Sequence, residues 1–92
     1  MIQLKPNHWK IIKDILNQYP YQFYAFGSRV KQTSRPFSDL DLCYKTEIPD
    51  HILTEIKGQF SDSDLPFIVE LINWNQCTTE FQELIAKDLI AI

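Results

Sequence analysis

From residue 39 to residue 42 the chain alternates acidic and apolar side chains, and the segment from residue 39 to residue 45 constrains the fold more than any other. A period of two is typical of a β-strand, in which successive side chains point to opposite faces of a sheet. One face of a strand over 40–45, preceded by Asp39, would carry Asp39, Asp41 and Cys43, and the other would carry Leu40, Leu42 and Tyr44. The chain must therefore build a sheet with a core on one face and a pair of carboxylates on the other.

The remaining periodicities divide the chain into alternating helices and strands. We expect helices over 7–18 and 50–60, a helical turn over 28–31, strands over 22–26, 40–45 and 67–73, and a last helix from Thr79, where Thr79 and Gln82 form a capping box. The helix between the second and third strands favours a parallel pair there, and the short link between the first two favours an antiparallel pair. The predicted fold is α/β (α+β): a small mixed three-stranded sheet flanked by about four helices, in the order α-β-turn-β-α-β-α.

The bulk properties narrow the class of protein. The 92 residues point to a single domain over 1–92, and 45% of them are apolar. No apolar run is long enough to span a bilayer, so no membrane association and a cytoplasmic location are expected. The two cysteines form neither a disulfide framework nor a zinc motif. The net charge of −3 argues against direct nucleic-acid binding, which needs a basic footprint.

A Gly-Ser pair follows the first predicted strand, at Gly27 and Ser28. Glycine lets the backbone approach a ligand closely, and N–H groups at the start of a helical turn favour anions. Ser28 adds a hydroxyl donor, and Arg29, directly after it, can bind phosphate oxygens in bidentate fashion. We therefore expect Gly27, Ser28 and Arg29 to bind the phosphates of a nucleotide, although Gly-Ser pairs also occur in ordinary turns.

Three acidic residues are candidates for catalysis and for a metal site: Asp39, Asp41 and Glu70. Mg²⁺ takes hard oxygen ligands, usually one or two carboxylates completed by phosphate oxygens and water. Glu70 interrupts the apolar run 67–72, and it joins the aspartates if its strand lies beside theirs. Three carboxylates with two metal ions suit phosphoryl-type transfer. Two alternatives stay open: aspartates that are solvated or cap a turn, and a Glu70 that faces solvent on an edge strand.

The two motifs together resemble the signature of the DNA polymerase β-like nucleotidyltransferase superfamily. The matching segments are Ala25-Phe26-Gly27-Ser28-Arg29 and, after a gap of ten residues between Ser28 and Asp39, Ser38-Asp39-Leu40-Asp41-Leu42. The short chain is similar to the minimal branch of that superfamily, the MNT proteins. The resemblance covers essentially the whole chain and implies the nucleotidyltransferase fold.

The resemblance also implies a function. MNT proteins usually pair with a small helical HEPN protein, a toxin that cleaves RNA, and characterised members transfer AMP from ATP to a tyrosine of that toxin. Carried over residue by residue, Asp39 and Asp41 match the metal-binding aspartates and Gly27 and Ser28 the triphosphate-binding turn. Glu70 matches the third carboxylate, which is commonly Asp.

Three functions follow as competing hypotheses. The first is an antitoxin that adenylylates its HEPN partner with ATP and Mg²⁺ (two ions), in a hetero-oligomer with the toxin. The second is a non-catalytic antitoxin that neutralises the toxin by binding alone, which the Glu at the third acidic position favours. The third is transfer to a small molecule, ranked last because the sequence offers no second domain to build an acceptor pocket.

Overall fold

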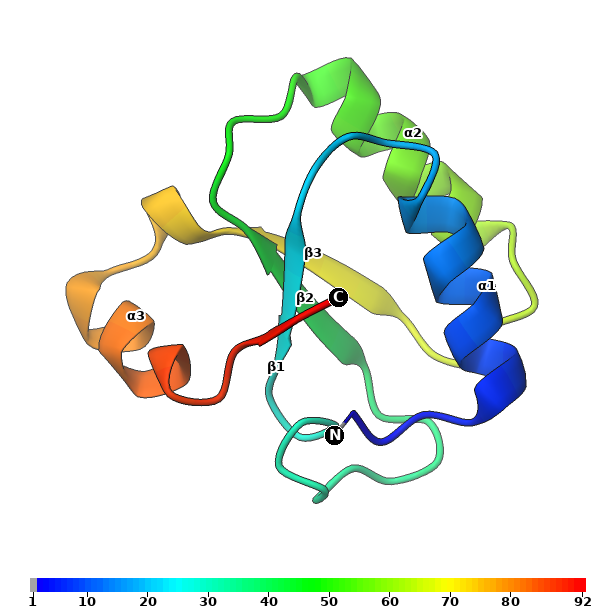
Figure 1. Ribbon diagram of the computed structural model, residues 1–92, viewed down its shortest axis with the longest axis horizontal. Coiled ribbons are helices and arrows are strands. Elements are labelled where there is room, and N and C mark those ends of the chain that lie inside the picture. Colours follow the sequence, from blue (N-terminus) through cyan, green and yellow to red (C-terminus); the bar gives the residue numbers. More distant parts are fainter. Residues whose placement is uncertain (1) are drawn as a thin grey trace.

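The computed structural model describes residues 2–92, which form one sheet between two helical layers (Figure 1). The elements in chain order are α1 (Pro6–Leu16), β1 (Phe23–Phe26), β2 (Leu40–Tyr44), α2 (Asp50–Ser61), β3 (Val69–Asn73), a 3-10 helix η1 (Trp74–Gln76), α3 (Thr79–Ala86) and β4 (Ile90–Ala91). None of the helices over residues 2–92 is both long and apolar enough to cross a membrane.

The sheet has the strand order β3-β2-β1-β4. The first two strands pair antiparallel and the second and third pair parallel, which confirms both predicted pairings. The register aligns Asp41 with Phe26 on one side and with Glu70 on the other. The strand that carries the paired aspartates is therefore central, while β3 lies at an edge.

The two faces of the sheet carry separate apolar clusters. The helices α1 and α2 pack on one face, and α3 packs on the other (Figure 1). The larger cluster contains Ile12, Leu16, Phe23, Ala25, Leu40, Leu42, Tyr44, Ile56 and Phe60. The smaller one contains Phe26, Cys43 and Ile85, with Ile72, Trp74 and Phe81 packed against it. The predicted division of β2 is thus confirmed, because Leu40 and Leu42 face the large core and Cys43 faces α3.

Three details differ from the sequence prediction. The sheet has a fourth strand, β4, whose two residues pair antiparallel with β1 and are too few to show a period of two. The predicted helical turn is present as a single hydrogen-bonded turn, in which the Lys31 N–H donates to the Gly27 carbonyl, and it does not count as a helix, so residues 2–92 contain three α-helices and one 3-10 helix instead of about four helices. The capping box is wrong by one residue: Thr78 is the N-cap of α3 and accepts from the Phe81 N–H at 3.2 Å, while Gln82 donates to the Trp74 carbonyl.

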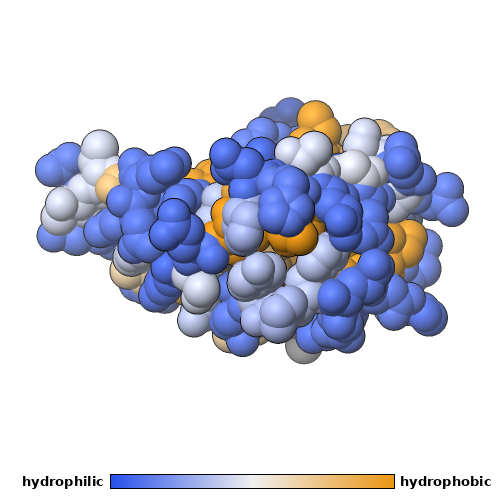
Figure 2. All heavy atoms as spheres, turned by 90° about the horizontal axis from the view of Figure 1, so that it is seen from above, coloured by the Kyte–Doolittle hydropathy of each residue, from blue (hydrophilic) through white to orange (hydrophobic). Residues whose placement is uncertain are grey.

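The surface at the end where α2 begins is mainly hydrophilic. Figure 2 shows this end from above, with hydrophobic side chains visible between the hydrophilic ones. The loop that joins β1 to β2 lies at the opposite end, close to the first residues of the chain (Figure 1). The Gly27-Ser28 pair after β1 and Asp39 before β2 therefore lie at the end of the molecule away from the view of Figure 2.

Candidate active site

The Gly-Ser turn closes tightly at the end of β1. The Gly27 carbonyl accepts the N–H groups of Val30 and Lys31, at 3.1 and 3.0 Å, and the Ser28 carbonyl accepts the N–H of Thr33 at 2.9 Å. The N–H groups of Ser28 and Arg29 donate to no acceptor within residues 2–92. These unused donors at a turn are what an anion needs.

Gly27 lies against the carboxylate of Asp41. Its φ of +84° belongs to the left-handed region that favours glycine, and a Cβ built there would lie 2.5 Å from Oδ2 of Asp41. No other residue type can occupy position 27 without moving that carboxylate. The structure therefore brings the Gly-Ser turn and the acidic motif together, as the sequence motifs require.

Asp41 lies at the centre of the acidic group. Burial raises the pKa of its carboxyl, and the charges of Glu70 and then Asp39 raise the pKa further. The register places Glu70 directly beside Asp41 on the neighbouring strand, so that the two side chains share a face of the sheet. Asp39 and Glu70 are both exposed, whereas Asp41 is half-buried. The charges of Glu70 and Asp39 thus repel that of Asp41 at the start of β2.

This acidic group fits a divalent cation, although it is not a preformed cage. Within residues 2–92 no three His, Cys, Asp or Glu side chains are gathered closely enough to hold a metal by themselves. Mg²⁺ needs fewer, because it completes its shell with phosphate oxygens and water. The donors are hard oxygens and their mutual repulsion would be relieved by a cation. Glu70 also lies exposed on an edge strand, which is the alternative that the sequence left open.

Arg29 does not lie where the sequence predicted. Arg29 is 5% exposed, and its guanidinium donates to three backbone carbonyls. The acceptors are Ser38 (Nε 3.1 Å, Nη2 2.7 Å), Pro36 (Nη2 3.3 Å) and Gln3 (Nη1 2.8 Å). The structure therefore brings Gly27 to the acidic group, whereas the Arg29 side chain is bound to the backbone of the neighbouring loop and of residue 3.

Cys43 follows Asp41 on the same face but has no exposed surface. Burial raises the pKa of its thiol to about 11. The thiol therefore stays protonated near neutral pH, and Cys43 packs in the small cluster under α3 as an apolar side chain.

Comparison with known proteins agrees with this geometry. The family described as "Polymerase beta, Nucleotidyltransferase" matches residues 10–92. The chain is also 39% identical, over 95 aligned residues, to a protein of Haemophilus influenzae named "Probable protein adenylyltransferase MntA". The alignment covers 99% of this chain and 83% of that relative. This chain belongs to the polymerase beta nucleotidyltransferase family.

The nucleotidyltransferase carries exposed apolar residues beside its acidic group. Phe37, two residues before Asp39, is 72% exposed, and Ile68, two residues before Glu70, is 65% exposed. The Ile68 carbonyl accepts the N–H of Leu40, which fixes Ile68 next to the start of β2. The loop before β2 and the segment before β3 therefore each present one large apolar side chain to solvent.

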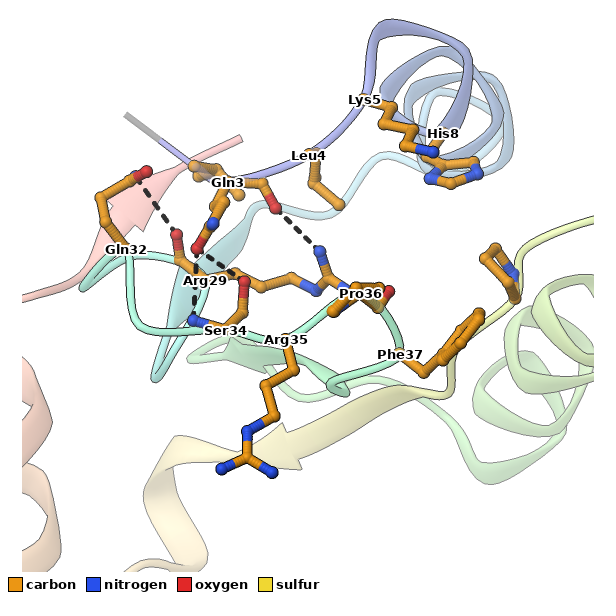
Figure 3. Close-up of a pocket in the computed structure, with 12 residues that line it drawn as sticks. Gln3, Leu4, Lys5, His8, Arg29, Gln32, Ser34, Arg35, Pro36 and Phe37 are labelled. Atoms are coloured by element: carbon orange, nitrogen blue, oxygen red, sulfur yellow. Dashed lines mark hydrogen bonds between the residues drawn. The ribbon is translucent and has the colours of Figure 1, made fainter.

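A cavity of about 600 Å³ adjoins the site but does not contain the carboxylates. The first residues of the nucleotidyltransferase, including Gln3 and Lys5, form one wall, and the loop residues Ser34 and Phe37 form another (Figure 3). Gln3 is central to this wall, since its side-chain oxygen accepts from the Ser34 hydroxyl at 2.6 Å. No sequence pattern points to Gln3, because its hydrogen-bond partners Arg29 and Ser34 lie 26 and 31 residues away along the chain.

Proposed function

We propose that this nucleotidyltransferase transfers AMP from ATP to a tyrosine of a HEPN-family toxin, in a Mg²⁺-dependent reaction that makes it the antitoxin of the pair. The observation that carries the proposal is the meeting of Gly27, Asp41 and Glu70 at one end of the sheet. The name of the 39% identical relative, a probable protein adenylyltransferase, supports a protein as the acceptor. So do the exposed Phe37 and Ile68 at the rim.

The site residues have separate roles in binding the triphosphate, holding the cation and accepting the proton. The turn at Gly27 and Ser28 binds the triphosphate through its N–H groups and hydroxyl, and Asp39 and Asp41 hold Mg²⁺ with Glu70 as a third ligand. When bound, Mg²⁺ supplies charge neutralisation on the triphosphate. The phenolic oxygen of the acceptor forms a bond to the α-phosphorus, and the bond from that phosphorus to the bridging oxygen breaks, so that pyrophosphate leaves. Glu70, exposed at the sheet edge, or Asp41 accepts the phenolic proton.

The test is transfer of α-labelled AMP to the purified HEPN partner, followed by mass spectrometry of the modified peptide. Wild-type protein should modify a tyrosine, and Asp39→Asn and Asp41→Asn should each slow the transfer by roughly 10²-fold or more, as the loss of groups that bind charge at a reacting centre does. Asp64→Asn, an exposed aspartate in the loop after α2, is the matched control and should transfer normally. Absence of labelled partner with wild-type protein would sink the proposal.

A second candidate is neutralisation of the toxin by binding alone. The exposure of Glu70 on an edge strand and the three exposed apolar residues Phe37, Ile68 and Leu84 favour it. The double variant Asp39→Asn/Asp41→Asn separates the two functions. It should fail to relieve toxin-dependent growth arrest if transfer is the mechanism, and it should relieve the arrest if binding suffices.

A further inference from the structure

We propose that Arg29 is a positioning residue for the transfer reaction: its guanidinium fixes the Gly27–Ser28 turn relative to the start of β2, where Asp39 lies. This inference rests on the proposed function, because the site that Arg29 positions is the proposed site. The hydrogen-bond partners of the guanidinium are backbone carbonyls, and within residues 2–92 it donates to no carboxylate of the acidic group.

The Arg29 side chain is hydrogen-bonded to the segment that leads into β2. Two nitrogens of the planar guanidinium converge on one carbonyl, that of Ser38, at 3.1 and 2.7 Å. A third bond reaches the Pro36 carbonyl at 3.3 Å. Because Ser38 is bonded to Asp39, this fork sets both the position and the direction in which the chain enters β2.

The Arg29 backbone is part of the turn that begins at Gly27 and Ser28. The Arg29 backbone is held by Gln3, whose N–H donates to the Arg29 carbonyl at 2.8 Å, while Arg29 Nη1 donates back to the Gln3 carbonyl at 2.8 Å (Figure 3). Arg29 directly follows Ser28, inside the turn that the Gly27 carbonyl closes. One residue thus belongs to the phosphate-binding turn by its backbone and to the acidic motif by its side chain.

The Arg29 guanidinium also packs against the segment that leads into β3. The guanidinium carbon lies 4.1 Å from the centre of the Phe67 ring, a cation–π contact. Phe67 is buried just before β3, and the next carbonyl, of Ile68, accepts the Leu40 N–H. The segment that leads to Glu70 is therefore packed on the same cation.

The free-energy cost of burying the Arg29 guanidinium indicates that its role is to form directional hydrogen bonds. Burial lowers the pKa of Arg29, with a partial opposing effect from the charge of Asp39, and within residues 2–92 no carboxylate forms an ion pair with the guanidinium. Burying a charge is costly, and this cost is offset only by the hydrogen bonds that the guanidinium makes to backbone carbonyls. Three separate carbonyls explain its presence, since only a planar fork of donors serves them at once.

The decisive variant is Arg29→Lys, which keeps the charge and loses the fork. If Arg29 positions the acids, kcat should fall by about 10²-fold, as for displacement of reacting groups by about 1 Å, while KM for ATP stays within about twofold. The Mg²⁺ concentration for half-maximal rate should rise. A direct contact with the triphosphate, the role that sequence alone predicted, would instead raise KM for ATP.

Chemical rescue distinguishes positioning from general destabilisation. Arg29→Ala should lose at least as much activity as Arg29→Lys, and guanidinium chloride at non-denaturing concentration should restore roughly tenfold of it, while potassium chloride at equal ionic strength restores none. Lys10→Ala removes an exposed cation on α1 and should behave as wild type with or without guanidinium.

Binding measurements keep the inference separate from the proposed function. Mn²⁺ binding, followed by electron paramagnetic resonance with a non-hydrolysable ATP analogue, should be about tenfold weaker in Arg29→Lys than in wild type. Equal Mn²⁺ affinities, or an unchanged kcat, overturn the role of Arg29 even where wild type transfers AMP. If wild type transfers nothing, the proposed function fails and Mn²⁺ binding alone decides on Arg29. If circular dichroism shows Arg29→Lys to be unfolded, Phe67→Leu should show the same changes at smaller size, and wild-type values in it overturn the inference.

Discussion

The two faces of the central strand β2 serve different purposes, although they differ by a single residue along the chain. Leu40 and Leu42 have no exposed surface and lie in the large core with α1 and α2. Asp41, between them, points to the other face, where it meets Gly27 and the charge of Glu70. One face therefore belongs entirely to the large core, while the other combines the small cluster around Cys43 with like charges whose repulsion opposes folding.

The largest effect that tests this comparison is on stability. Leu42→Ala should lower the free energy of unfolding by about 2–5 kcal/mol, because a fully buried leucine leaves a cavity. Urea unfolding followed by tryptophan fluorescence measures it. Leu84→Ala is the matched control, since Leu84 is 59% exposed on α3 and should change stability by less than about 0.5 kcal/mol. Similar losses in both variants would remove the distinction between the faces.

The second effect is on activity. Gly27→Ala forces a side chain against the Asp41 carboxylate and into a strained φ, and it should slow transfer by about 10²-fold, as misplacement of a reacting group does. Gly58→Ala is its control: Gly58 lies in α2 with nothing within 4 Å of an added Cβ. That variant should keep full activity and gain about 0.4–1 kcal/mol of stability. Normal transfer by Gly27→Ala would show that the contact between turn and carboxylate is not needed.

The smallest effect concerns how α3, the short cover of the acidic face, begins. Thr78→Ala should cost about 1 kcal/mol of unfolding free energy, because it removes the N-cap bond to the Phe81 N–H. Thr79→Ala, one residue further and already helical, should be close to neutral. Thermal unfolding of the two variants side by side measures the difference, and a larger loss for Thr79→Ala would restore the capping box that the sequence suggested.

Most of the fold could be predicted because its elements are long enough to show a period. The alternation around Asp41 predicted both faces of β2, and the helix between β2 and β3 predicted their parallel pairing. β4 could not be predicted, since Ile90 and Ala91 owe their strand conformation to pairing with β1 rather than to any pattern of their own.

The candidate site was predicted in part. The sequence placed Gly27, Ser28, Asp39, Asp41 and Glu70 together, because spacing and strand order suffice for that. It misplaced Arg29, whose neighbour Ser28 suggested a shared ligand. The partners of Arg29 are backbone carbonyls and the face of Phe67, and backbone carbonyls leave no mark in a sequence. The direction in which a side chain points can be known only from the fold, whereas its position along the chain can be read from the sequence.

The near-contact between residue 27 and the Asp41 carboxylate has a wider consequence for how such sites can be transplanted or recognised. The glycine is required twice over, by the handedness of its backbone and by the oxygen that occupies the space of its missing side chain. Grafting the aspartates alone onto another scaffold would omit the glycine whose missing side chain leaves space for the Asp41 carboxylate. A search for related sites should accordingly require the Gly-Ser pair and the spaced aspartates together, and should not count either pattern alone as a match.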